Sequence, residues 1–295
     1  MYTKSIAQKI FQVFNHLIFI IVCLSCILPF LNLLAVSFSD SAAVRAGWVK
    51  FFPINFTTAS YEFAFRGGRF LPSLWVSVQR VALGVFTNLL LMILAAYPLS
   101  HPKEKLAGRN IYMIFFVTTM VLNGGIIPTY LLVSQLGLLN SIWALVLPSG
   151  LPVFSMIILM NFIRSLPLEI EESANIDGAN PIKFLLFIML PLLTPSLATV
   201  GLFSIVFHWN DWFGGMIYIQ NYLKYPLQTY LQMLLRKFED LIRMNQTNYA
   251  DIIAQMNVRN GRAAQLFLGS IPIALIYPFL QKYFTTGLVM GSVKG

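Results

Sequence analysis

The chain has 295 residues, of which 57% are hydrophobic and 11% are charged, and its mean hydropathy is +0.72. One soluble core cannot bury this much apolar surface, so the composition excludes an ordinary soluble domain and indicates one domain in a lipid bilayer, with room for about six spans of ~20 residues. The formal net charge is +9, but the basic residues are scattered among loop ends. That distribution argues against a nucleic-acid partner and fits the flanks of membrane spans, in contact with membrane lipid.

The N-terminal part of the chain is expected to form a retained first span. Lys4 and Lys9 precede an apolar run over residues 10–38. This run is longer than the core of a signal peptide and lacks a small-residue cleavage site. Cys23 and Cys26 lie inside it with no other soft ligand nearby. We expect them to be small buried hydrophobic residues rather than a redox or zinc site.

Further apolar segments follow, separated by polar or Gly/Pro-containing joints, so the sequence predicts an all-α integral membrane protein with six transmembrane helices. Six spans place both termini on one side of the membrane. The positive-inside count does not choose that side, because nine Lys/Arg fall on one side and ten on the other. Arg80 lies in a span near an outer end, where it snorkels or, alternatively, lines a cavity. The predicted spans are residues 10–38, 72–99, 110–133, 141–163, 186–207 and 264–288.

An acidic segment after the fourth span is expected to lie in water. Glu169, Glu171, Glu172 and Asp177 fall within nine positions. One carboxylate at the bilayer centre costs about 2.5–3.5 kcal/mol, so four together exclude residues 164–183 from the lipid. Acidic residues are favoured in the first turns of a helix, where they meet the positive end of its dipole.

Residues around the acids predict a short helix, a sharp turn and a second helix. Pro167 is expected as the first helical residue, and Gly178 permits the left-handed conformation that ends a helix. Asn180 and Pro181 are typical of the start of the second helix, which enters the membrane at Pro191.

The spacing in this segment resembles a known family signature. Glu172-Ser173-Ala174 is followed after three residues by Gly178 and after nine more by Ile188-Met189-Leu190-Pro191. This is similar to the pattern EAA, three residues, Gly, nine residues and Ile-x-Leu-Pro of permease subunits of ABC importers, with Ser173 as the departure. Pro167-Leu168-Glu169 and Asp177-Gly178-Ala179 resemble the carbohydrate branch, the maltose-type permeases and more closely their relatives for complex oligosaccharides. The resemblance runs from about Phe70 onward.

The resemblance implies a type I ABC importer transmembrane fold with a cytoplasmic coupling helix in the loop over residues 164–185. That helix would dock on a cytoplasmic ATPase, Ala174 and Gly178 allowing contact without bulk, and the second helix would act as a rigid lever on the fifth span. Both termini would then be cytoplasmic, in a bacterial cytoplasmic membrane. The alternative is a solvated loop with helix caps. The implied coupling residues are Glu169, Glu172, Ser173, Ala174, Asp177, Gly178 and Ala179.

The C-terminal residues carry a second implication. By resemblance to maltose-type permeases, Ser292, Val293, Lys294 and Gly295 reach the interface of an ATPase homodimer; the alternative is a frayed tail. The other implied partners are a second homologous permease, an extracytoplasmic sugar-binding protein and an oligosaccharide substrate.

The chain lacks the sequence features of an enzyme. It has no GxxxxGK[ST] loop, so ATP and Mg would be bound by partner subunits and this chain would need no cofactor of its own. His16, His101 and His208 are far apart in sequence, and no metal-ligand spacing is present. The predicted spans contain no acids, and their one histidine, His16, lies near the start of the first span; this composition offers little for proton coupling and disfavours a secondary transporter. A permease for peptides or amino acids remains an alternative, as does a membrane-embedded enzyme or scaffold.

Polar residues and helix breakers in the spans indicate a substrate path. Irregular backbone at membrane depth is tolerated where it lines a cavity or is covered by protein. Sugars need hydrogen-bonding groups and aromatic faces. The candidate path residues are Asn88, Asn123, Tyr130 and Trp143; packing of the spans is the alternative role.

The segment over residues 208–263 is predicted to be external. After Pro226 its apolar residues follow the spacing of an amphipathic helix, which packs on the spans, lies in the membrane interface or contacts the binding protein. His208-Trp209-Asn210-Asp211-Trp212 at its start resembles a family motif and suits an aromatic belt. The predicted external side holds ten Lys/Arg against six acids, which favours an anionic substrate such as a uronic-acid-containing oligosaccharide.

Overall fold

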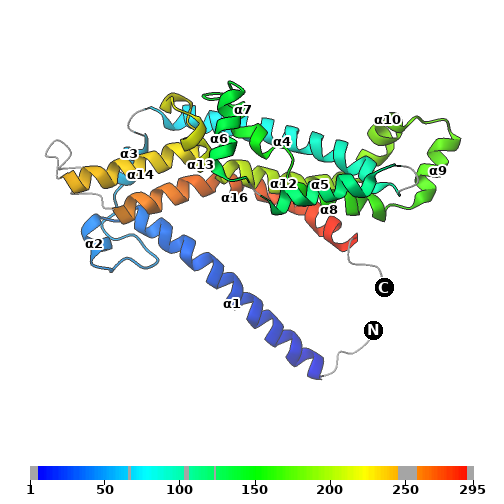
Figure 1. The fold of residues 1–295 in the computed structure, drawn as a ribbon. Helices are drawn as coiled ribbons and strands as arrows, with labels where there is room; N and C mark the ends of the chain where they lie inside the picture. Colours follow the sequence, from blue (N-terminus) through cyan, green and yellow to red (C-terminus); the bar gives the residue numbers. More distant parts are fainter. Residues whose placement is uncertain (1–5, 66–67, 103–105, 123, 245–257, 291–295) are drawn as a thin grey trace. The chain divides into compact units, whose positions relative to one another are not determined.

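The computed structural model describes residues 6–65, 68–102, 106–122, 124–244 and 258–290, and every regular element in these ranges is a helix (Figure 1). Asn123 and the tail residues Ser292–Gly295, both predicted to be functional, lie outside the described residues. The chain divides into two compact units. The first comprises residues 1–70 and 231–271, and the second comprises residues 71–230 and 272–295.

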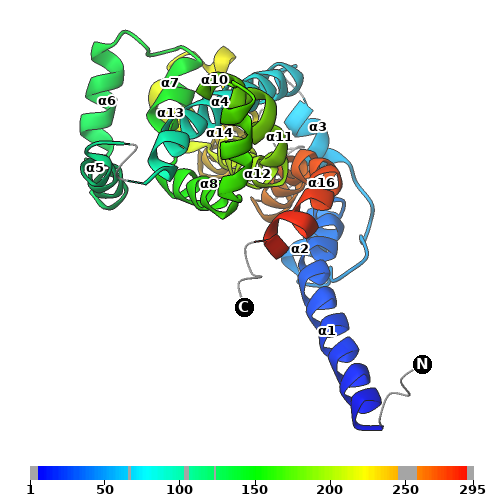
Figure 2. The same cartoon turned by 90° about the vertical axis from the view of Figure 1, so that its right-hand side faces the viewer.

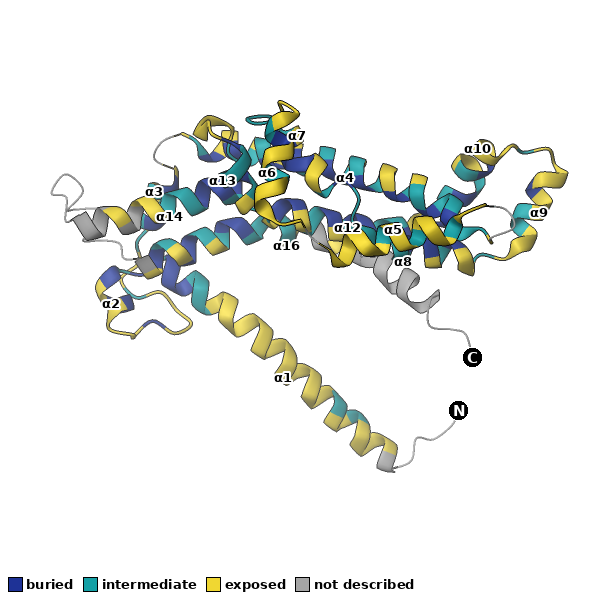
Figure 3. Cartoon of the chain, viewed as in Figure 1, coloured by how far each residue is buried: buried dark blue, intermediate teal, exposed yellow. Residues whose placement is uncertain are grey.

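In the first unit, α1 (Ile6–Ser37) is long and apolar enough to cross a membrane. Most of its side chains are exposed along its length, as Figure 3 shows. Cys23 and Cys26 are exposed on this helix, so the prediction that they are buried is wrong for the isolated chain. An exposed apolar helix of this length leaves its surface to lipid or to another subunit.

The end of α1 is fixed by short helices and by the start of α16. Asp40 accepts a hydrogen bond from the backbone N–H of Ala42 and thereby caps α2 (Ser41–Arg45). The buried amide of Asn260, in α16 (Val258–Met290), donates to the carbonyl oxygens of Val36 at 3.3 Å and Ser39 at 2.6 Å. These bonds satisfy carbonyl groups where α1 ends and the chain turns toward α3 (Ala59–Phe65).

The second unit is built on α4 (Phe70–Ser100), which agrees with the predicted span 72–99 and is long enough to cross a membrane alone. It lies beside α8 (Val153–Ser165) and α12 (Thr194–Asn210) in both views (Figures 1 and 2). Small and flexible side chains fill the space between these helices. The fully buried members include Met92, Ala96, Met156, Leu159 and Val200.

Three predicted spans are each divided between two helical pieces. The third consists of α5 (Arg109–Val121) and α6 (Ile126–Gln135). The fourth consists of α7 (Trp143–Val146) with η1 (Leu147–Ser149), followed by α8 at a bend of 56°. The described residues thus contain two helices that could span a membrane alone, or up to five spans if each bent pair is one span.

The fifth predicted span is also broken. After α9 (Leu168–Ile176) come α10 (Pro181–Lys183), a π-helical turn η2 (Phe184–Met189) and α11 (Leu190–Leu192), and then α12 begins at an angle of 80°. The expected rigid lever from the acidic segment into the fifth span is therefore a jointed element. Pro191 and Pro195 remove two backbone donors near this joint, which explains why the helix does not continue through it.

The predicted amphipathic helix is α14 (Leu227–Met244), which follows α13 (Phe213–Tyr218) and η3 (Tyr222–Lys224). Its first residues are buried, with Leu227 at 0% and Tyr230 at 4% exposure. The backbone N–H of Leu227 donates to the hydroxyl of Ser77 on α4 at 2.7 Å. The start of the helix therefore packs on this chain.

Candidate functional site

A buried ion pair joins α4 to the residue that follows α12. The side chain of Arg80 is 1% exposed, and its guanidinium pairs with the carboxylate of Asp211. Its Nη1 also donates to the backbone oxygen of Asp211 at 2.6 Å, and its Nη2 to the backbone oxygen of Leu145 at 3.4 Å. The prediction that Arg80 snorkels to the surface is therefore wrong. Its partner Asp211 lies 131 residues later in the chain and outside the predicted spans. The residues within those spans therefore gave no indication of this ion pair.

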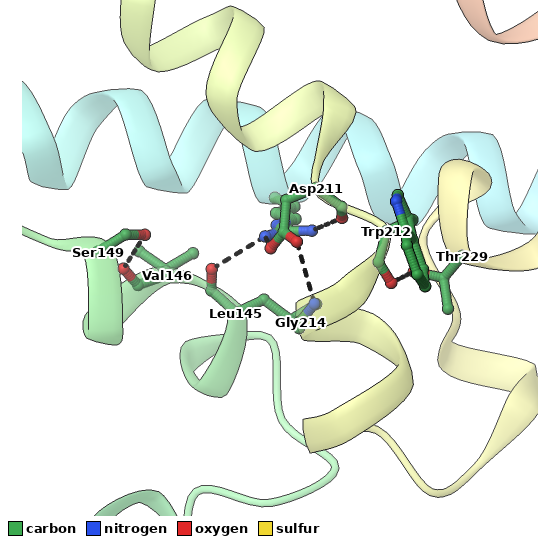
Figure 4. Close-up of polar contacts among 8 residues, drawn as sticks. Leu145, Val146, Ser149, Asp211, Trp212, Gly214 and Thr229 are labelled. Carbon is green, nitrogen blue, oxygen red and sulfur yellow. Dashed lines mark hydrogen bonds and ion pairs between the residues drawn. The ribbon is translucent and has the colours of Figure 1, made fainter. Parts of the chain in front are cut away.

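The structure fixes Asp211 from several sides. The backbone N–H of Gly214 donates to its carboxylate at 3.0 Å (Figure 4). Burial raises the pKa of Asp211, but the Arg80 guanidinium and the N–H groups of Gly214 and Phe213 lower it more, so the pKa lies below its ordinary value. The carboxylate therefore stays ionised and holds a compensated charge next to the wall of a cavity.

A cavity of about 750 Å³ lies beside this pair in the second unit. Its wall comes from α6, the α7–η1 segment, the end of α12 and α13. It combines aromatic rings with hydroxyl, amide and carboxylate groups. The polar and aromatic residues that line the cavity are Thr129, Ser149, Phe207, Asn210, Asp211, Trp212, Phe213 and Tyr218.

The residues predicted for the substrate path occupy different places. Asn88 is 1% exposed; its amide faces the Ser204 hydroxyl at 3.3 Å on one side and lies 2.9 Å from the Gly84 carbonyl oxygen on the other. It therefore lies among packed helices and not in the wall of the cavity. Tyr130 stacks on Tyr218, with ring centroids 6.4 Å apart, and so supports one cavity residue. Trp143 is 42% exposed on α7 and is not part of the wall.

Sequence reasoning missed most of the wall. Asn210, Asp211 and Trp212 were noted as part of a family motif, but their share in function was open. Ser149 belongs to a helix-breaking stretch of the fourth predicted span, whereas Phe213 and Tyr218 carried no signal of their own. These residues line the same cavity because the helices break after η1 and after α12, and the breaks turn both segments toward it.

His208 illustrates how closely α12 approaches α4. The imidazole is 1% exposed, and neither ring nitrogen has a hydrogen-bond partner among the described residues. A Cβ added at Gly84 would lie 2.4 Å from this ring. Glycine at position 84 therefore leaves the space that the buried His208 ring occupies.

We expect Gly84→Ala to destabilise the folded chain by about 1–3 kcal/mol, the usual cost of overpacking a filled core. Gly201→Ala is the matched control on α12, because its added Cβ would first meet Leu89 at 3.9 Å, an ordinary contact. Unfolding of the purified complex in mixed micelles, followed by tryptophan fluorescence, measures both variants. Equal stability of the two would contradict the packing described here.

The acidic segment contains the predicted helix, turn and second helix. Pro167 is the N-cap rather than the first residue of α9, Gly178 has φ = +75°, and the side chain of Asn180 accepts from the N–H of Lys183 at 2.8 Å. Ala174 is 4% exposed and packs into the core of the second unit, and Ala179 is half-buried. Ala174 therefore offers no surface to a partner in this structure, contrary to expectation. Five candidate residues are exposed: Glu169, Glu172, Ser173, Asp177 and Gly178.

Polar contacts at the C-terminal end of α4 connect this helix to the neighbourhood of the acidic segment. Arg164, which precedes α9, donates to the backbone oxygen of Leu99 at 3.0 Å, and Arg109 donates to the same oxygen at 2.9 Å. The carboxylate of Glu171 lies 3.5 Å from Nε2 of His101. Cations at the last carbonyl groups of a helix satisfy unpaired acceptors and favour its negative end.

Comparison with known proteins identifies the family. No protein-family model matches the chain. It is 39% identical over 290 residues to Protein LplC of Bacillus subtilis (strain 168), covering 98% of this chain and 96% of LplC. It is 34% identical over 289 residues to the polygalacturonan/rhamnogalacturonan transport system permease protein YtcP of the same strain, covering 98% of this chain and 99% of YtcP.

A solved structure supports assignment to the same kind of protein, a transport permease. The chain matches a bacterial ABC transporter involved in the import of the acidic polysaccharide alginate, with a TM-score of 0.80 and 28% identity over 96% of this chain and 100% of that chain. YtcP is named as a polysaccharide transport permease, and the solved structure is that of an ABC transporter that imports a polysaccharide. The chain therefore belongs to the permease subunits of carbohydrate ABC importers, and it is a non-catalytic membrane subunit of such a transporter.

Proposed function

We propose that this chain forms half of the translocation pore for an oligosaccharide and pairs with a second, homologous permease. The observation that carries the proposal is that the similarity to YtcP and to the alginate importer extends over nearly the whole chain, 98% and 96% of it respectively. The exposed apolar surface of α1 supports a need for lipid or a further membrane subunit around this chain.

We further propose that α9 and the turn at Gly178 dock on a cytoplasmic ATPase, which supplies the energy. The exposed surface of this segment combines carboxylates with an apolar residue, since Ile176 is 87% exposed. An exposed apolar side chain beside acids is suited to a cleft with an apolar floor and basic or polar rims. This docking places both termini in the cytoplasm and an extracytoplasmic binding protein on the opposite side. In the same arrangement the tail Ser292–Gly295 reaches the interface of the ATPase dimer.

The substrate is proposed to be acidic. YtcP is described as a polygalacturonan/rhamnogalacturonan permease, and the structural neighbour imports alginate. On this chain, Lys224 lines a second pocket of about 340 Å³ with Gln79 and Ser141, and its ammonium donates to the Asn140 carbonyl oxygen at 3.0 Å. A cation at the proposed outer end would attract an anionic sugar as it approaches.

Uptake by a strain that lacks this gene tests the proposal. We expect the deletion to abolish import of oligosaccharides that contain uronic acid, and a plasmid copy of the gene to restore it. Neutral oligosaccharides of equal length, measured in parallel, separate the general function from the charge preference. Unchanged uptake of both classes would refute the transport function, whereas loss of neutral uptake alone would refute only the acidic substrate.

A further inference from the structure

The cavity beside Arg80 and Asp211 has the size and the wall of a ligand site. Binding cavities for small molecules commonly measure about 300–1,000 Å³ and combine apolar and aromatic walls with a few placed polar groups. This cavity of about 750 Å³ has that composition and lies within one unit of the chain. We propose that it binds glycosyl units of the transported oligosaccharide through ring faces and hydroxyl groups, and not through charge. This inference rests on the transport function proposed above.

Aromatic side chains provide the apolar part of the wall. Phe207 and Phe213 are about half exposed, at 51% and 49%, and Trp212 packs edge-on against Phe213 with ring centroids 5.6 Å apart. Tyr218 is held by the parallel ring of Tyr130, whose plane is 10° from its own. Rings fixed in this way can pack against the C–H faces of a pyranose without losing further conformational freedom.

The polar groups in the wall divide into donors and acceptors. The hydroxyl of Thr129 donates to the Gly125 carbonyl oxygen at 2.8 Å, and that of Ser149 donates to the Val146 carbonyl oxygen at 3.3 Å. Each hydroxyl has one proton, so these two side chains offer only lone pairs to a ligand. The exposed amide of Asn210 carries both donors and an acceptor. A wall that accepts and donates suits sugar hydroxyl groups, which do both.

The charges next to the cavity cancel each other. Asp211 is 25% exposed at the wall, and its partner Arg80 is 1% exposed with its Nη atoms engaged by Asp211 and the Leu145 carbonyl oxygen. Arg80 is not among the residues that line the cavity, and those residues include no cation. A uronate therefore meets no uncompensated cation at the described wall. The cavity is expected to bind neutral and acidic glycosyl units similarly, so any selection for acidic sugars operates before the substrate reaches it.

A cysteine reporter in the assembled transporter tests this site directly. Ser149→Cys is introduced in a Cys23→Ser/Cys26→Ser background, and the complex with its partner permease, ATPases and loaded binding protein is held in nanodiscs. We expect oligosaccharide to slow maleimide labelling of Cys at position 149. Binding protein without sugar should not slow it. Ser165→Cys, at an exposed position outside the cavity, is the control whose labelling should be unaffected by sugar.

Two substitutions in the reporter background test the wall itself. Tyr218→Phe removes a hydroxyl and Asn210→Ala removes an amide, so the sugar concentration for half-maximal protection should rise about two- to tenfold. Tyr222→Phe, an exposed tyrosine outside the wall, should leave it unchanged. Protection by acidic oligosaccharides should also withstand a tenfold rise in ionic strength, because compensated charges contribute little to binding.

The outcomes separate this inference from the proposed function. Sugar uptake by the transporter without protection of position 149 would overturn the inference and leave the transport function standing. Protection that vanishes in salt would show that a cation, and not the neutral wall, holds the sugar. A reconstituted transporter that neither imports sugar nor shows sugar-dependent protection would overturn the function and the inference together.

Discussion

Gly178→Asp is expected to abolish oligosaccharide uptake while the chain still inserts in the membrane. Gly178 has φ = +75°, and a Cβ added there would meet nothing within 4 Å on this chain. The internal cost of the substitution is therefore limited to the left-handed backbone, roughly 1 kcal/mol for a residue such as Asp. A complete loss of transport would then report an obstructed contact with the proposed ATPase.

Gly47→Asp is the matched control. Gly47 has the same φ of +75°, is exposed, and has nothing within 4 Å of an added Cβ, so the substitution introduces the same strain and the same charge elsewhere. We expect near-normal uptake for this variant. Membrane fractionation measures insertion, and recovery of the ATPase with the purified chain measures docking. Normal uptake and normal ATPase recovery with Gly178→Asp would contradict the docking proposal.

Breaking the buried ion pair should have the second large effect. Arg80→Met leaves the Asp211 carboxylate without its guanidinium, and Asp211→Asn leaves a buried cation without its anion. Removing one partner of a buried pair costs about 3–5 kcal/mol, because the remaining charge has lost both water and its counterion. Joint replacement by Arg80→Met and Asp211→Asn should cost much less than the sum of the two single effects.

Unfolding in mixed micelles of increasing SDS content gives the free-energy differences for this cycle. The pKa of Asp211 is lowered in the folded chain, so the contribution of the pair is fully present above the ordinary aspartate pKa of about 3.9 and is lost only as pH falls below it. The stability difference between Asp211→Asn and the unsubstituted chain should accordingly be constant from about pH 5 to 8. Additive single effects would contradict a direct interaction between the two groups.

Local sequence patterns predicted the helices that depend on local periodicity and capping. The bounds of α4 and α14 and the turn at Gly178 follow from apolar spacing, from Pro226 and from a glycine with positive φ. The burial of Ala174 was not predicted, since its small side chain is compatible with close contact to a partner protein and with packing in the chain's own core. Only the packing of α9 on the second unit decides between the two.

The cavity wall and the ion pair could not be predicted in the same way. Arg80 and Asp211 are 131 positions apart, and nothing local to Arg80 indicates its partner. The break near Leu193 also opposes strong apolar periodicity, which favours a continuous fifth span. Long-range placement depends on how helices pack, and that information is spread over many side chains of the core.

Helix α4 is held by arginine at two points, by Arg80 near the cavity and by Arg109 and Arg164 at the Leu99 carbonyl. From residue 80 to residue 99 an α-helix rises about 28 Å. A hydrogen-bonded helix resists compression over that distance, so α4 can work as a strut. A displacement applied at the Leu99 end would reach the cavity beside Arg80 without passing through the bend of 80° before α12.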